Sequence, residues 1–207
     1  GNAGENEQQT TSNIDYTGCR RTLYLEALDG STGICLQTTT ADETLPSLYS
    51  KVQILLYGTT GTLKLDPERY DVTGLTSSMI TSQTPGTKAD VPVKKKTIGT
   101  LDDTDIYTYV TITGVEFAIR KGPLFPVNEG YTNATNAHRL SKLPLLFRDA
   151  EGNSMYILTN TTCLYRRDGT AIPQGCGNLS GVLVHERFPR YNWRNLADPA
   201  EAIQARY

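Results

Sequence analysis

The sequence has no long hydrophobic run, no excess of positive charge and few histidines or cysteines. No apolar stretch approaches the roughly 20 residues that a membrane-spanning helix needs. The formal net charge of −2 argues against binding nucleic acid through its phosphates. The four cysteines show no C-x-x-C spacing and no nearby histidine pair, so a zinc site is not expected. These absences argue against a membrane-spanning helix, a phosphate-binding surface and a zinc site, and the composition is ordinary for a folded soluble protein.

What the sequence does contain is typical of β-sheets. Tyrosine outnumbers phenylalanine twelve to four, and threonine is plentiful. Both residue types suit pleated, half-exposed strands better than helix interiors. At 207 residues with 38% hydrophobic residues, the chain can bury the core of one large β domain or of two small ones. We therefore expect an all-β fold.

Two stretches of the chain repeat one pattern. "LYLEALDGSTGICLQT" (23–38) and "LPLLFRDAEGNSMYILT" (143–159) each alternate apolar and other residues on both sides of a turn with Asp and Gly, which is typical of a β-hairpin. Their first strands lie 120 positions apart and their second strands 121. "PERYDVTGL" (67–75) and "FPRYNWRNL" (188–196) are also 121 positions apart. This repetition predicts a duplicated unit, and an OB-like Greek-key barrel fits its length and content.

The repeat predicts two tandem OB-like barrels. Residues 1–100 would hold the first unit, with a polar N-terminal leader and a linker, and residues 101–207 would hold the second. Residues 76–105 are rich in Ser, Thr, Pro and Lys and are the expected linker. The lysine run at 94–96 is expected to be a solvated connector, with ligand binding as the less favoured alternative.

The first unit is expected to lack a strand that the second unit has. A strong strand at 107–119 precedes the second hairpin, whereas only the polar leader precedes Thr22. Either residues upstream of this sequence supply the strand or the first barrel stays open. We therefore expect an incomplete first barrel and a more nearly closed second one. At the other end, Asp198, Pro199 and Glu201 form a capping pattern that predicts a short C-terminal helix.

Several motifs resemble one family. "IYTYVTITGVEF", "RKGPLFPVNEGYTN" and "GNSMYILTNTTCLYRRDGTAIPQGCGNLSGVLVHERF" are similar to OB-fold-like domains of unknown function in secreted and surface lipoproteins of Bacteroidetes. The first half, with "YSKVQILLYG" and "PERYDVTGL", resembles the N-terminal portion of the same family. The chain departs from it by lacking a G-x-V-x-S-like first strand and by having Cys176 where serine is more usual. The resemblance implies a location at the cell surface or in the periplasm, with membrane attachment only through a lipid anchor outside this chain.

No group of residues predicts catalysis. The two histidines, His138 and His185, are accompanied by no G-x-S-x-G motif, and His185 and Glu186 would point to opposite faces of a strand. The acidic run at 102–105 lacks the glycine turn and the distal Glu of a calcium loop. We therefore expect a protein that is not an enzyme and uses neither cofactor nor metal. A hydrolase that uses His185 is the least favoured alternative.

The leading interpretation is a non-catalytic binding or scaffolding module of the cell envelope. The resemblance to surface lipoproteins implies a glycan or an envelope protein as its ligand. OB-like barrels commonly hold oligomeric ligands, and aromatic and arginine side chains suit such surfaces. The alternative from another class is an OB protein that binds single-stranded nucleic acid, which the pI of about 5.7 disfavours. The residues expected to contact the ligand are Tyr131, Arg166, Arg167, Tyr191 and Trp193.

The four cysteines allow two disulfides. Cys163 and Cys176 are the expected pair if the protein is exported to an oxidising compartment. In the chain-entropy model such a bridge stabilises the fold by about 3 kcal/mol. Buried free thiols are the alternative.

Overall fold

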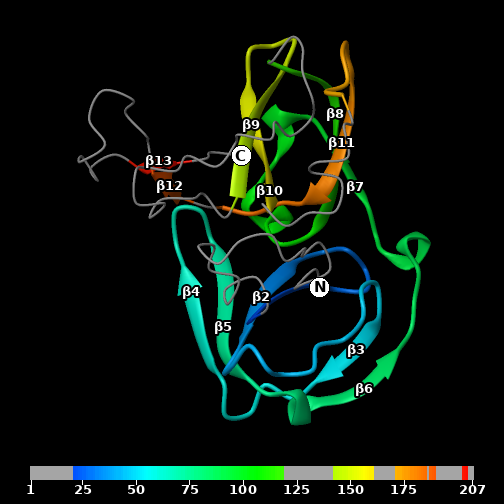
Figure 1. Cartoon of the computed structure of the whole chain (residues 1–207), viewed down its shortest axis with the longest axis vertical. Coiled ribbons are helices and arrows are strands. Elements are labelled where there is room, and N and C mark those ends of the chain that lie inside the picture. The colour runs from blue at the N-terminus through cyan, green and yellow to red at the C-terminus, as the bar shows by residue number, and fades with distance from the viewer. Residues whose placement is uncertain (1–20, 119–141, 161–170, 186, 190–201, 205–207) are drawn as a thin grey trace.

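The computed structural model describes residues 21–118, 142–160, 171–185, 187–189 and 202–204 (Figure 1). Over these residues the secondary structure is almost entirely β, with thirteen strands and four short 3-10 helices. The predicted all-β class is therefore confirmed. The short helices are η1 (Ser77–Met79), η2 (Lys88–Asp90), η3 (Ile98–Thr100) and η4 (Asp103–Asp105).

The first sheet has four strands in the order β1-β2-β5-β4. The β2–β5 pair is parallel, while the β1–β2 and β4–β5 pairs are antiparallel. The register places Leu23 beside Leu36 and Leu36 beside Val72, and all three side chains are buried on one face because side chains alternate along a strand. The strands are β1 (Thr22–Glu26), β2 (Gly33–Thr38), β4 (Thr60–Lys64) and β5 (Arg69–Leu75).

A two-stranded ribbon contributes to the core of the first sheet. β3 (Lys51–Ile54) pairs antiparallel with β6 (Ile80–Thr84). Ile54 and Met79 pack against the buried cluster of Leu23, Leu36, Val72 and Leu75. In Figure 1 the ribbon lies on the side of the lower half opposite the β4–β5 hairpin.

The second sheet has the strand order β10-β9-β8-β11, and β7 also pairs with β8, in parallel. Its longest strand, β8, carries a bulge: the register with β11 shifts by one residue at Gly114, whose φ is 70°. The extra residue brings Val115 to the same buried side as Val110 and Ile112. The strands are β7 (Lys94–Lys96), β8 (Tyr109–Phe117), β9 (Lys142–Asp149), β10 (Ser154–Asn160) and β11 (Gly177–Val182).

The predicted linker is wrong as a description of residues 76–105. This stretch provides β6 and β7, and all four 3-10 helices lie within it. The lysine run is not a solvated connector either, because the Lys94 and Lys96 ammonium groups lie 3.1 and 3.0 Å from the buried carboxylate of Asp105. The predicted boundary between residues 100 and 101 stays a prediction, although β7 already belongs to the second sheet.

Both predicted hairpins are present, but their registers differ. β1–β2 and β9–β10 are antiparallel pairs at the expected positions. Leu25 pairs with Ile34, whereas its counterpart Leu145 pairs with Ile157, the counterpart of Leu36. This shift of two residues keeps every side chain on its original face. The surrounding order also differs, since β2 joins the first hairpin to its sheet and β9 joins the second.

The sheets are open in the part of the chain that the structure describes. β1 and β4 end the first sheet, so the described strands form an open sheet there and the incomplete barrel stays a prediction. The second sheet ends in β10 and β11, so the described strands do not show the more nearly closed barrel expected for the second copy. Figure 1 shows the two sheets one above the other.

The predicted C-terminal helix is wrong at residues 202–204. These residues form β13 (Ala202–Gln204), which pairs antiparallel with β12 (Arg187–Pro189). Residues 198–201, which carry the capping pattern, lie outside the described segments. The pattern is a local signal, and pairing with a strand some 15 residues earlier overrides it.

The buried residues form two hydrophobic clusters, and the larger one is a core shared by both sheets. Cys35 of β2 is buried in the same cluster as Val110, Phe147 and Met155 of the second sheet, and Tyr24 of β1 packs against that cluster. At Gly33 the backbones come so close that an added Cβ would lie 2.4 Å from the carbonyl carbon of Tyr107. The first hairpin therefore packs directly on the second sheet.

Candidate ligand-binding pocket

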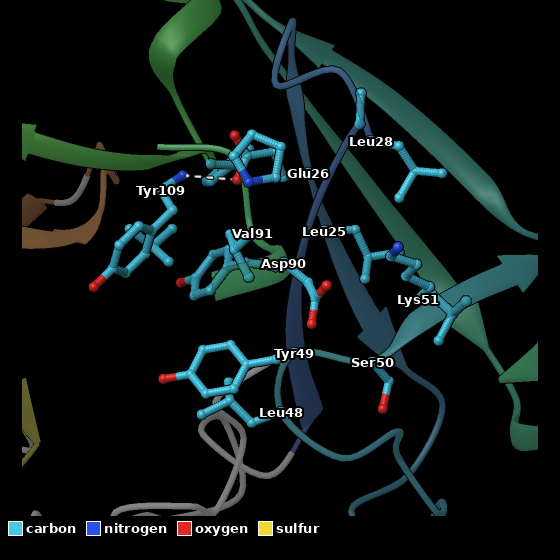
Figure 2. Close-up of a pocket in the computed structure, with 16 residues that line it drawn as sticks. Leu25, Glu26, Leu28, Leu48, Tyr49, Ser50, Lys51, Asp90, Val91 and Tyr109 are labelled. Atoms are coloured by element: carbon cyan, nitrogen blue, oxygen red, sulfur yellow. Dashed lines mark hydrogen bonds between the residues drawn. The ribbon is translucent and has the colours of Figure 1, made fainter. Parts of the chain in front are cut away.

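A pocket of about 310 Å³ lies beside the junction of the two sheets (Figure 2). This volume is at the lower end of the range for ligand pockets, roughly 300–1,000 Å³. Four tyrosines contribute to its wall together with two carboxylates and one lysine, and leucine, valine and proline side chains complete it. The wall is formed by residues 24–28, 48–52, 90–92, Tyr107, Tyr109 and Val182.

Tyr49 reaches the pocket from a tight turn. The Ser50 N–H donates to the carbonyl of Ser47 at 3.2 Å, and Gln83 of β6 lies within hydrogen-bond distance of both serine hydroxyls. Tyr49 is the third residue of this turn and has φ of 65°. That left-handed backbone costs a residue with a side chain roughly 1–2 kcal/mol, and glycine or asparagine usually occupies such a position. The turn therefore contains a large aromatic residue at a position whose backbone conformation favours glycine or asparagine.

The chain at Gly86 lies against the backbone of Tyr49. A Cβ at Gly86 would lie 2.4 Å from the carbonyl oxygen of Tyr49. The absence of a side chain at Gly86 thus allows the turn to lie this close to the neighbouring chain.

Tyr107 has the same unusual backbone and is firmly held. Its φ is 67°, and its N–H donates to the carbonyl of Leu183 at 2.7 Å. The hydroxyl donates to Asp71 of β5 at 2.6 Å, and the ring stacks on that of Tyr24, with 5.5 Å between centroids. Burial, followed by the hydrogen bond to Asp71, raises the pKa of Tyr107 far above its usual range. The ring is therefore a neutral, rigid part of the wall.

Glu26, the last residue of β1, is one of the two carboxylates that line the pocket. Its Oε2 accepts a hydrogen bond from the Tyr109 N–H at 3.1 Å, which Figure 2 shows as a dashed line. Its Oε1 is buried and has no hydrogen-bond partner. Burial raises the pKa of this carboxyl, while the hydrogen bond from Tyr109 and the charge of Lys94 act in the opposite direction.

Asp90 and two lysines complete the charged part of the site. The Asp90 carboxylate accepts hydrogen bonds from the N–H and hydroxyl of Thr87, which lower its pKa, and the charge of Lys51 lowers it further. These bonds form a capping box on η2 and so fix Asp90. The ammonium of Lys88, also on η2, lies 5.7 Å from the centroid of the Tyr109 ring.

The predicted contact residues stay a prediction. Tyr131, Arg166, Arg167, Tyr191 and Trp193 all lie outside the described residues. Cys163 and His138 lie outside them too, so the disulfide between Cys163 and Cys176 stays a prediction; Cys176 has an exposed thiol. His185 is half-buried and does not line the pocket.

The sequence carried only a weak signal for the pocket. Tyrosine is abundant, but Tyr24, Tyr107 and Tyr109 sit in or beside strands, where tyrosine is common. Nothing local marks Tyr49 and Asp90 as neighbours of β1. The positive φ values, which single out Tyr49 and Tyr107, are visible only in the structure.

Comparison with protein-family models, with curated proteins and with solved structures found no significant match to this chain. The resemblance to the Bacteroidetes lipoprotein family therefore stays a prediction. No helix in the described segments is long and apolar enough to cross a membrane. Those segments also hold no group of three or more His, Cys, Asp or Glu side chains placed to share a metal ion.

Proposed function

We propose that this protein is a non-catalytic binding module of the cell envelope and that the tyrosine-lined pocket holds part of a glycan. The proposal includes the finer arrangement of two tandem OB-like units and an exported location, both of which rest on the sequence pattern and the family resemblance. OB-like folds commonly bind oligosaccharides, which supports this class of ligand.

One observation carries the proposal. Among the described residues, only Tyr49, Asp66 and Tyr107 have a positive φ without being glycine, and two of these three line the pocket. Strained backbone of this kind persists where the surrounding structure enforces it, and such positions concentrate at ligand-binding sites. The fold thus places two aromatic rings in this pocket at a local cost.

The chemistry of the wall suits a sugar. A pyranose ring has an apolar face of C–H groups and a rim of hydroxyls. Tyrosine offers both a large apolar face and a polar hydroxyl, at little cost in conformational entropy. In Figure 2 the hydroxyls of Tyr49 and Tyr109 point to the same side of the view.

The two carboxylates of the pocket do not support glycoside hydrolysis. Opposite pKa shifts on Glu26 and Asp90 resemble the pattern of an acid and a base. A general acid must, however, reach the leaving oxygen within hydrogen-bond distance. The Oε1 of Glu26 is buried and its Oε2 is engaged by the Tyr109 N–H, so neither oxygen is presented to a ligand in this conformation. A binding role without catalysis fits this geometry better.

Single-stranded nucleic acid ranks below a glycan as the ligand. Bases would stack on the tyrosine rings, but the phosphates that join them need a basic groove. Glu26 and Asp90 line the pocket and repel phosphate, against one lining lysine. A salt-sensitive, micromolar affinity for labelled single-stranded DNA would reverse this ranking.

A glycan array followed by calorimetric titration tests the proposal. The wild-type protein is expected to bind at least one oligosaccharide, and Tyr49→Gly is expected to weaken that binding about tenfold or more by removing one stacking ring. Tyr57→Ala is the control, because Tyr57 is 94% exposed and does not line the pocket. Absence of binding to any glycan, or equal losses in both variants, would contradict a glycan site at this pocket.

A further inference from the structure

The outer edge of β4 is open to pairing with another strand. β4 ends the first sheet, and no strand in the described part of the chain pairs with its outer edge, which forms the margin of the lower half in Figure 1. All five of its residues are exposed. Proteins usually protect such an edge with a free lysine, a proline or a bulge. β4 has no proline, its register with β5 is regular, and its only lysine, Lys64, forms an ion pair with Asp71 of β5.

Gly61, inside β4, is not required by the fold of a single copy. Its φ is not positive, and nothing lies within 4 Å of the position that a Cβ would take. Glycine weakens the interior of a strand, and it commonly marks a bulge or a place where another backbone comes close. The register of β4 with β5 shows no bulge. The glycine therefore fits a strand that approaches β4 from outside this chain.

Leu63 and Tyr70 extend the apolar face of the sheet beyond its core. The two residues pair directly across β4 and β5, and their side chains are 47% and 49% exposed. Because side chains alternate along a strand, both lie on the same face as Val72, which is buried. Apolar side chains exposed together beside an open edge are typical of an interaction site.

We propose that β4 pairs with β4 of a second copy of this chain, antiparallel and about a twofold axis at Thr62. In this register Leu63 of each copy lies opposite Gly61 of the other, where no side chain competes for the space. The two Leu63 side chains meet diagonally on one face, and each continues into Tyr70 of its own copy. The pairing thus covers the apolar residues that a single copy leaves exposed.

The charge on β4 favours this orientation. Lys64 is the only charged residue of the strand, and antiparallel pairing places it opposite Thr60 of the other copy. Parallel pairing in register would place two lysines side by side, which is unfavourable. The strand is therefore complementary to itself, as a twofold interface requires. β1, which lines the pocket, is at the other end of the sheet, so the pairing leaves both pockets open and does not depend on their ligand.

Sedimentation velocity of the complete chain, over a roughly hundredfold range of concentration, tests the pairing. A strand of five residues makes a small interface, so we expect a reversible monomer–dimer equilibrium with a Kd on the order of 10 µM. Thr62→Lys places two like charges opposite each other at the axis and should weaken the dimer about tenfold. Within its own copy the new side chain lies opposite Asp71, so the folded monomer should tolerate it. Ser82→Lys, at an exposed position of β6, is the matched control and should leave the equilibrium unchanged.

A cysteine at the axis gives a second, independent measurement. Residues directly opposite each other in an antiparallel pair have Cα atoms about 4.5–5.5 Å apart, a distance that a disulfide spans. Thr62→Cys is therefore expected to give a covalent dimer on mild oxidation with copper phenanthroline. Mass spectrometry should find the peptide that carries the substitution joined to its own copy. The wild type, with its natural cysteines, and Ser82→Cys are oxidised in the same way as controls.

The contrary outcomes are distinct from those for the glycan site. A chain that stays monomeric at every concentration would overturn the pairing, even if it binds glycans. A dimer that persists unchanged in Thr62→Lys, or that weakens equally in Ser82→Lys, would show that β4 is not the interface. Growth beyond the dimer would indicate a head-to-tail contact in place of the twofold one. A dimer that forms without the cross-link in Thr62→Cys would contradict the proposed register.

Discussion

Gly33 occupies a position where even a methyl group would collide with the neighbouring chain. A Cβ there would lie 2.4 Å from the carbonyl carbon of Tyr107 and 2.7 Å from the carbonyl oxygen of Ile106. Both atoms belong to backbone that cannot move without disturbing the shared core. Gly33→Ala is therefore expected to lower the free energy of unfolding by about 2–3 kcal/mol, as overpacking does. Urea unfolding of the variant and of the wild type measures this loss in the free energy of unfolding. Gly61→Ala is the control, since nothing lies within 4 Å of its Cβ position; an equal loss there would contradict the collision.

Two substitutions of Tyr49 should differ in protein stability but not in ligand affinity. Because its φ is 65°, glycine should be more stable than alanine at this position by about 1 kcal/mol. Both substitutions remove the ring, so both should lose ligand affinity to the same extent. Thermal unfolding and calorimetric titration of Tyr49→Gly and Tyr49→Ala give the two comparisons. If alanine proved as stable as glycine, the left-handed backbone would not be costly at this turn.

Glu26 gives the pocket a dependence on pH. Its pKa is raised by burial above the ordinary 4.5, so the folded protein holds this proton more tightly than the unfolded chain does. The resulting contribution favours folding at pH below 4.5 and is lost as the pH rises through the raised value. Glu26→Gln stays neutral throughout. We expect it to match wild type near pH 4 and to exceed its stability near pH 7, as measured by urea unfolding at both values. A difference that does not change with pH would contradict the raised pKa.

At the scale of elements, β7 is held by charge as well as by pairing. Asp105 is 1% exposed and bridges the ammonium groups of Lys94 and Lys96 on alternate positions of this strand. Removing one member of a buried ion cluster leaves the others uncompensated. Asp105→Ala is therefore expected to cost about 3 kcal/mol of unfolding free energy, whereas Lys95→Ala, on the opposite, exposed face, should change it by less than about 0.5 kcal/mol. Chemical denaturation of both variants is the measurement, and similar small effects would show that the cluster contributes little.

The elements that the sequence predicts well are those with a local signature. The alternation around Leu23 and Leu145 predicts both hairpins, and the dense β-branched run at 109–117 predicts β8. The lysine run at 94–96 has the composition of a solvated segment, so the sequence does not predict a strand there. Parallel pairing with β8 makes it a strand, and the buried Asp105, brought close by the fold, compensates the charges of Lys94 and Lys96. An ion-pair partner about ten residues away in sequence does not change the alternation of apolar and polar residues from which a strand is predicted.

The candidate site was largely beyond prediction for a related reason. Its wall combines β1, the turn around Tyr49, the end of η2 and the start of β8, which are distant in sequence. Their meeting depends on Gly33 and Gly86, each of which permits a close approach between two backbones. Glycine is compatible with many kinds of turn, so neither glycine predicts that two distant backbones approach each other there. The predicted contact residues rest on side-chain type alone, and they lie outside the described segments.

At the scale of the whole molecule, the shared core argues against two independently stable units. Cys35 is buried among side chains of the second sheet, and the Tyr107 hydroxyl crosses to Asp71 of β5. Glu26 of β1 accepts from the backbone of β8, and Glu68 donates its N–H to Asp103 at 2.8 Å. Separation of the sheets would expose apolar surface and leave these polar groups without their partners.

A mild substitution in the second sheet should therefore lower the hydrogen-exchange protection of both sheets equally. Ile112→Val removes one buried methyl group and is expected to cost about 1 kcal/mol. In native-state hydrogen exchange, the slowest amides of β2 and of β8 should then lose protection together, by about fivefold, because both open only when the whole molecule unfolds. Two independent units would instead leave the β2 amides unchanged while β8 exchanges faster. The same experiment on Val72→Ala, buried in the first sheet, should give the reciprocal result in β8 if the sheets form one cooperative unit.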